Sequence, residues 1–82
     1  MNDLWHKLHV VFRDVFDDET LTVSASTTAR DVPGWDSLNH VNLIVAVEKA
    51  FGIKLTTREA TTLANVGELA ALVERKLTRA RG

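Results

Sequence analysis

Two long segments of the chain carry apolar residues at every third or fourth position. The first covers residues 3 to about 17, and its apolar stripe consists of Leu4, Leu8, Val11, Phe12 and Val15, flanked by Trp5 and Phe16. The second runs from Ser37 to Phe51 and is apolar on most sides, which is typical of a helix packed between other helices. Both periods predict α-helices, and Gly52 is expected to end the second one.

Two further helices are predicted in the second half of the chain. Thr56 and Glu59 form a capping box for a short helix of about two turns. Asn65 and Glu68 repeat this arrangement before a last helix, whose apolar stripe consists of Val66, Leu69, Ala70, Val73 and Leu77. The stretch "DDETLTVSASTTARDVPGW" has no sustained period. We therefore expect an all-α four-helix bundle, with three longer helices, one short helix and a long loop between helices one and two.

Length and composition favour a single domain over residues 1–82. An apolar content of 45% and a charged content of 26% are ordinary for a small globular protein. The chain has no cysteine, so it offers neither a disulfide nor a thiolate metal site, and we expect a cytoplasmic protein. The start lacks a signal-peptide pattern, and no apolar run reaches the ~20 residues of a membrane span. We expect a free-standing monomer without a bound metal.

The charges are distributed unevenly along the chain. Residues 1–36 carry seven acidic and three basic side chains, whereas residues 37–82 carry four acidic and seven basic ones. The basic excess is concentrated in "ERKLTRARG" at the end, which suits the negative end of a helix dipole. Nucleic-acid binding favours a basic stripe along a folded face instead, so we expect no nucleic-acid partner.

The stretch "VPGWDSLNHV" places Asp36 and Ser37 at the predicted start of the second long helix. The first-turn amides of a helix have no intrahelical acceptor, and the positive end of the dipole favours an anion there. Ser37 therefore fits either an ordinary N-cap or a hydroxyl that becomes a phosphodiester. Catalysis by Ser37 is not expected, because a nucleophilic serine needs a positioned base and an oxyanion site. The candidate bases are His6, His9 and His40, and the first two have no acid partner visible in the sequence.

The run "WDSLNHVNLIVAVEKAFGIKL" resembles the acyl carrier proteins, and the resemblance extends to the order of the helices and the V-x-x-L start of the last one. It implies that Ser37 receives 4′-phosphopantetheine from coenzyme A, that Asp36 helps to position magnesium, and that Leu38 contacts the phosphopantetheinyl transferase. It also implies a carrier and not an enzyme. The missing thiol would arrive with the arm, which holds acyl groups as thioesters.

The same resemblance implies further partners and an acyl-chain pocket. The partners would be an acyl-loading ligase or acyltransferase, and a ketosynthase or other acyl-processing enzyme. Apolar side chains expected to shelter the acyl chain between the helices are Val41, Ile44, Val45, Leu55, Ala60, Leu63 and Leu69, although each also fits an ordinary core position.

The sequence departs from the fatty-acid carriers in its charges. Those carriers resemble one another in having a strongly acidic second helix and third-helix region. The corresponding positions in this chain include Asn39, Asn42, Lys49, Thr57 and Arg58, and Glu48 is the acidic residue that is retained. Electrostatic steering by basic partners should therefore be weak. We expect a specialised carrier for a dedicated lipid or polyketide-type pathway, with partner contacts at Trp35, His40, Asn42, Val45, Glu48 and Arg58.

Two other interpretations remain open at this point. An aminoacyl or peptidyl carrier protein would have the same fold and the same modified serine with a different cargo, although such carriers more often resemble a glycine-rich stretch before that serine. A helical module without any modification would instead bind a partner helix in a groove. Failure of Ser37 to accept the arm would favour the second interpretation.

Overall fold

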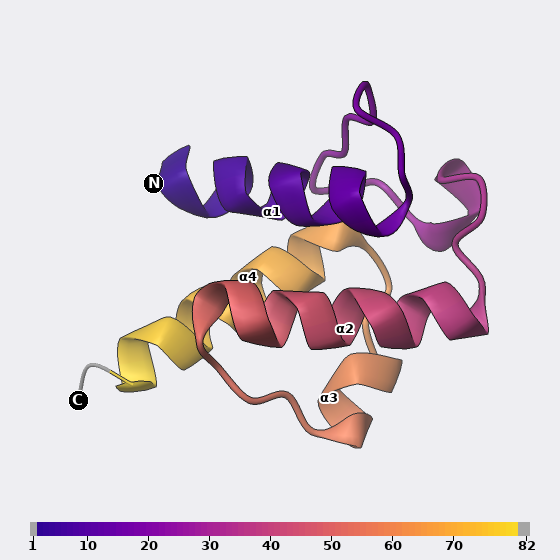
Figure 1. Cartoon of the computed structure of the whole chain (residues 1–82). Coiled ribbons are helices and arrows are strands. Elements are labelled where there is room, and N and C mark those ends of the chain that lie inside the picture. The colour runs from indigo at the N-terminus through magenta and orange to yellow at the C-terminus, as the bar shows by residue number, and fades with distance from the viewer. Residues whose placement is uncertain (1, 81–82) are drawn as a thin grey trace.

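Four α-helices make up the computed structural model, which describes residues 2–80 and the side chains of residues 3–78. They are α1 (Asn2–Val15), α2 (Ser37–Phe51), α3 (Thr57–Thr61) and α4 (Val66–Ala80). In Figure 1, α1 and α2 run side by side, and α3 lies beside α2 on the side away from α1. The all-α class and the order of the helices confirm the sequence prediction. No helix in the described residues is long and apolar enough to cross a bilayer.

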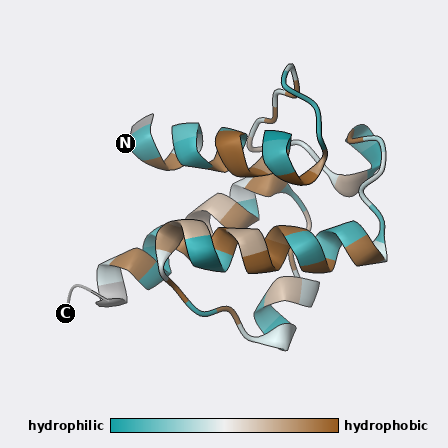
Figure 2. Ribbon diagram, viewed as in Figure 1, coloured by the Kyte–Doolittle hydropathy of each residue, from teal (hydrophilic) through white to brown (hydrophobic). Residues whose placement is uncertain are grey.

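The core forms where the apolar stripes of α1, α2 and α4 meet. Figure 2 shows hydrophobic and hydrophilic residues alternating along these helices. The largest fully buried side chains are Phe12, Leu8, Leu43, Leu69, Val47, Val66 and Val73. All seven are positions that the helical period marked as apolar, so burial of these faces stabilises the bundle.

Helix α1 ends at Val15, about two residues earlier than its apolar pattern predicts. Asp17 adopts the left-handed conformation with a φ of 52°, and the Asp18 amide donates a 3.0 Å hydrogen bond to the Arg13 carbonyl. This left-handed residue turns the chain away from the helix axis, as C-terminal caps do. Phe16 therefore packs from the start of the loop.

The long connection between α1 and α2, called loop 1 here (residues 16–36), has fixed anchors. Val23 and Val32 are buried in the core. The amides of Val66 and Gly67, in the first turn of α4, each donate a 2.8 Å hydrogen bond to a loop 1 carbonyl. The loop also contains a short 3-10 helix, η1 (Ala29–Asp31), which the sequence pattern did not predict. Loop 1 is thus packed structure that positions the start of α2.

Helix α3 is shorter than expected, with five residues in place of about two turns. The predicted capping box is present, because the Glu59 amide donates to the Thr56 hydroxyl (3.1 Å) and the Thr56 amide donates to the Glu59 carboxylate (2.9 Å). Threonine is a weak helix former, and the hydroxyls of Thr61 and Thr62 bond back to carbonyls of the same helix. These competing bonds end α3 after little more than one turn.

A single ion pair joins α3 to α4 in the part of the chain that the structure describes. Lys76 Nζ lies 2.9 Å from Glu59 Oε1. The Thr56 amide, and after it the Lys76 ammonium, hold the pKa of Glu59 below its ordinary value of 4.5. Glu59 therefore both caps α3 and contacts α4.

Candidate functional site

The start of α2 assigns separate tasks to Asp36 and Ser37. Asp36 is the N-cap, and its carboxylate accepts a 2.9 Å hydrogen bond from the Asn39 amide. Ser37 is the first helical residue and is exposed. No described residue hydrogen-bonds to its hydroxyl. The interpretation of Ser37 as the cap is therefore wrong, because Asp36 is the N-cap and Ser37 already lies within the helix.

The turn before Ser37 is held in place by a side chain of α2. Asn39 Nδ2 donates a 2.7 Å hydrogen bond to the carbonyl of Gly34, which has a φ of 86°. The left-handed backbone of Gly34 is one that residues with a side chain rarely adopt. In the sequence, Asn39 stands out only because it is uncharged, and no local pattern links it to a glycine five residues earlier. Asn39 and Gly34 together fix where the serine hydroxyl is presented.

A cleft of about 570 Å³ opens beside Ser37. Loop 1, α2, α3 and the start of α4 all contribute to its walls. Asp36 and Ser37 lie at its edge, and the apolar part of its lining includes Val41, Leu63 and Leu69. A group attached to the Ser37 hydroxyl would thus have an apolar surface within reach.

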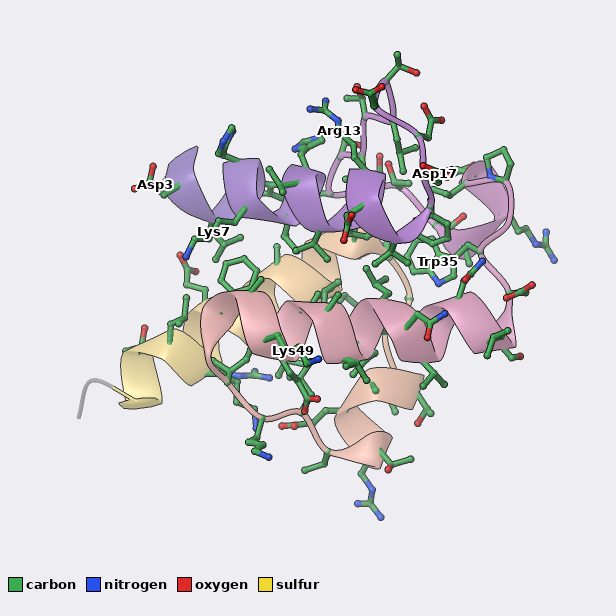
Figure 3. The ribbon with its side chains drawn as sticks, in the orientation of Figure 1. Asp3, Lys7, Arg13, Asp17, Trp35 and Lys49 are labelled. Atoms are coloured by element: carbon green, nitrogen blue, oxygen red, sulfur yellow. The ribbon has the colours of Figure 1, made fainter. Side chains whose placement is uncertain are left out.

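Trp35 and His40 form one wall of this cleft. Trp35 Nε1 donates a 3.1 Å hydrogen bond to His40 Nδ1, and the two rings are stacked with centroids 6.0 Å apart. In Figure 3, Trp35 lies between the end of α1 and the start of α2. Its ring packs edge-on against Phe12, with centroids 5.5 Å apart, and also contacts Phe16. Trp35 therefore connects the start of α2 to the core.

The sequence and the fold of this chain are similar to those of known proteins. Residues 6–73 match the model of a family described as "Phosphopantetheine attachment site". A solution NMR structure of a holo acyl carrier protein from Geobacter metallireducens is similar, with 45% identity and a TM-score of 0.86 over 93% of this chain and 87% of the other. The chain belongs to the acyl carrier protein family. Comparison with curated proteins finds no match.

The cofactor of this acyl carrier protein is a covalently attached 4′-phosphopantetheine. The start of α2 fits such a group, because the Ser37 hydroxyl is exposed and the first-turn amides of a helix lack intrahelical acceptors. The protein is a carrier, and as such it interacts with a phosphopantetheinyl transferase and with acyl-processing enzymes in general. The described residues include no cluster of three or more His, Asp or Glu side chains that could hold a metal ion.

The side chains expected to contact partners lie in different environments. Asn42, Val45 and Arg58 are exposed. Glu48 is half-buried, and its carboxylate accepts a 2.7 Å hydrogen bond from the Leu55 amide. Trp35 and His40 are half-buried too and bind one another.

The side chains expected to shelter an acyl chain are also divided. Val41, Ala60, Leu63 and Leu69 line the cleft. Ile44 is a buried core residue, Leu55 is half-buried, and Val45 is 43% exposed, and the cleft lining includes none of these three. The cleft therefore lies over the first turns of α2 only.

One side of α2 is open, although the sequence predicted a helix packed on most sides. Leu38, Val41 and Val45 are 70%, 58% and 43% exposed, and their spacing places them along one face. An apolar row of this kind suits contact with another protein.

Proposed function

We propose that Ser37 is the attachment residue and that the chain carries acyl intermediates as thioesters on the arm. The cap assignment supports this proposal most strongly. Because Asp36 satisfies the Asn39 amide, the Ser37 hydroxyl has no structural task and lies exposed at the edge of the cleft. In the transfer, the Ser37 oxygen bonds to the pantetheine-side phosphorus of coenzyme A while the pyrophosphate bond breaks. Adenosine 3′,5′-bisphosphate leaves, and the hydroxyl proton passes to a base of the transferase.

Asp36 and Leu38 are proposed to assist this transfer in different ways. One carboxylate oxygen of Asp36 caps α2, and no described residue hydrogen-bonds to the other. The second oxygen is of the hard type that magnesium prefers, so Asp36 would help to hold the ion in the transferase complex. Leu38, at 70% exposure, would bury its side chain against the transferase.

The exposed side of α2, which carries the apolar row, supports a specialised carrier with dedicated partners in a lipid or polyketide-type pathway. The helix contains one acidic residue, Glu48, and its carboxylate is already engaged by the Leu55 amide. Lys49 is the only lysine or arginine of the helix and is exposed. Partner recognition would then rest on the apolar row of Leu38, Val41 and Val45 more than on charge. We propose that the carrier acts as a cytoplasmic monomer.

Intact mass is the measurement that tests the attachment residue. The wild-type chain and Ser37→Ala are incubated with coenzyme A, magnesium and a broad-specificity phosphopantetheinyl transferase. We expect one added phosphopantetheine on the wild type and none on the variant. Circular dichroism establishes that both chains are folded, and a known carrier modified alongside shows that the transferase is active. A folded wild type that gains no mass would contradict the proposal and favour a helical interaction module.

A second experiment tests the role of charge in partner choice. Lys49→Glu and Arg58→Glu, combined in one chain, add acidic charge to the α2–α3 surface where both residues are exposed. We expect the double variant to react faster with the ketosynthase and acyltransferase of fatty-acid synthesis, which favour acidic carriers. Unchanged selectivity between those enzymes and the carrier's own partners would argue against the role of charge. Loading by an amino-acid-activating enzyme, and not by an acyl-loading one, would instead identify an aminoacyl carrier.

A further inference from the structure

His40 bridges α2 and α3 with both of its ring nitrogens occupied. A tryptophan Nε1 can only donate, so the 3.1 Å contact with Trp35 makes His40 Nδ1 an acceptor. The proton of the neutral ring is then on Nε2, which donates a 2.8 Å hydrogen bond to the Ala60 carbonyl in α3. Helix α3 has no fully buried residue, so this bond is one of the few contacts that hold it against α2.

The position of His40 along α2 relates directly to the cleft. Ser37, His40 and Ile44 are spaced three and four residues apart, which places them on the same face of the helix in successive turns. Ser37, His40 and Ala60 line the cleft, whereas the lining does not include Ile44, one turn deeper. Along α2 the cleft lining therefore ends at His40 and Val41, where the imidazole crosses to α3, while on the other side it reaches Leu69 of α4.

We propose that His40 is a specificity-determining residue that stops an acyl chain from passing deeper between α2 and α3. This inference rests on the proposed attachment of the arm at Ser37. A short chain fits the outer cleft with the His40–Ala60 bond intact. A longer chain reaches Ile44 only if that bond breaks and α3 moves away from α2. Trp35 opposes this movement, because it holds the imidazole from the other side and is itself packed against Phe12.

The experiment compares short and long acyl chains on the same protein. Butanoyl and dodecanoyl phosphopantetheine are loaded onto Ser37 from the corresponding acyl coenzyme A, and intact mass verifies each product. Thermal unfolding midpoints of both forms are then measured relative to the form with the free thiol. In the wild type we expect the two acyl forms to have the same midpoint within about 1 °C. In His40→Ala, burial of the additional methylenes should raise the dodecanoyl midpoint above the butanoyl midpoint by about 5 °C or more.

His9→Ala is the matched control. His9 is also a half-buried neutral histidine, which accepts a 3.1 Å hydrogen bond from the Val23 amide and donates a 2.9 Å one to the Trp5 carbonyl. His9 does not line the cleft. His9→Ala should therefore lower the unfolding midpoints of all forms without creating a difference between the butanoyl and dodecanoyl midpoints. His40→Val leaves a smaller void and serves as the second variant if His40→Ala does not fold.

Three results would overturn the inference. One is a dodecanoyl midpoint that already exceeds the butanoyl midpoint by about 5 °C in the wild type. Another is that His40→Ala and His40→Val both fold but their butanoyl and dodecanoyl forms have equal unfolding midpoints. The third is that His9→Ala raises the dodecanoyl midpoint above the butanoyl midpoint as much as His40→Ala does. If a folded wild-type chain gains no mass at all, the proposed attachment fails, and this inference fails with it.

Discussion

Substitution of Asp36 separates two tasks that this carboxylate is proposed to perform. As the N-cap of α2 it binds the Asn39 amide at 2.9 Å, and in the transferase complex its second oxygen would hold magnesium. Asparagine caps a helix about as well as aspartate does, because its carbonyl oxygen accepts the same hydrogen bond. Asp36→Asn should therefore keep the cap and lose the negative charge, whereas Asp36→Ala loses both.

The expected stability changes follow from these contacts. Loss of an aspartate cap to alanine costs about 1 kcal/mol, and loss of a negative charge at a helix N-terminus costs about 0.3–1 kcal/mol. Asp36→Ala should thus destabilise the chain by about 1–2 kcal/mol, and Asp36→Asn by less than about 1 kcal/mol. For a domain of this size, each kcal/mol lowers the melting temperature by about 4–8 °C. Ser37→Ala should stay within about 0.5 kcal/mol of the wild type, because the hydroxyl forms no hydrogen bond with any described residue.

The rates of modification should rank the same variants differently. If the charge of Asp36 holds magnesium, Asp36→Asn should slow phosphopantetheine transfer by about tenfold or more while remaining well folded. Urea denaturation measures the stability, and a time course of intact mass measures the transfer. Wild-type stability of Asp36→Ala would refute the cap, and a wild-type rate for Asp36→Asn would refute the role of the charge.

Three further changes test how the surrounding structure holds the site. Gly67→Ala should cost about 1–3 kcal/mol in urea denaturation, because the new Cβ would lie 2.7 Å from the Ala25 carbonyl oxygen, and retained stability would contradict the packing of loop 1 on α4. Gly52→Ala should cost about 1–2 kcal/mol although the space around it is open, because its φ of 66° disfavours any side chain, and a neutral effect in the same assay would contradict this cap. Glu59→Gln should lower the melting temperature near neutral pH. The pKa of Glu59 is lower in the folded chain than in the unfolded one, so the ionised carboxylate stabilises the fold above pH 4.5. This stabilisation is lost as the pH falls through the folded pKa, so the melting temperatures of the wild type and Glu59→Gln should converge in acid. A difference that does not depend on pH would refute the role of this ionised carboxylate.

The elements that the sequence predicted well are those set by a repeating apolar face. The positions of α1, α2 and α4 follow from burial of one side of each helix, and their boundaries agree to about two residues at most. The short 3-10 helix has no apolar period, because only polar contacts between Thr28 and Asp31 hold it. The length of α3 depended on the threonine hydroxyls competing for its carbonyls, which a capping box alone does not reveal.

At the candidate site, the sequence pointed to Ser37 but not to the contacts around it. Aspartate and serine are both good N-caps, so "DS" alone leaves open which residue begins the helix. Asp36 is the cap because of the turn that precedes α2, and the geometry of this turn depends on Gly34 and on the Asn39 side-chain amide. The bond from His40 to Ala60 spans 20 residues and requires α3 to be in place, so no spacing rule could have found it.

These tertiary contacts also fix the point from which the cleft and the apolar row of Leu38, Val41 and Val45 both begin, and Val41 belongs to both. Loop 1 is fixed to α4 through the Gly67 amide, and Trp35 fixes its end to the core, so the start of α2 is held at both sides. From this rigid point, the cleft leads toward α3 and α4, whereas Leu38 and Val45 of the apolar row are exposed and lie outside the cleft lining. An arm on Ser37 would therefore have two alternative directions, one toward shelter and one toward a docked enzyme. If His40 limits the depth of the shelter, it also limits the free energy that a partner must supply to draw the cargo out.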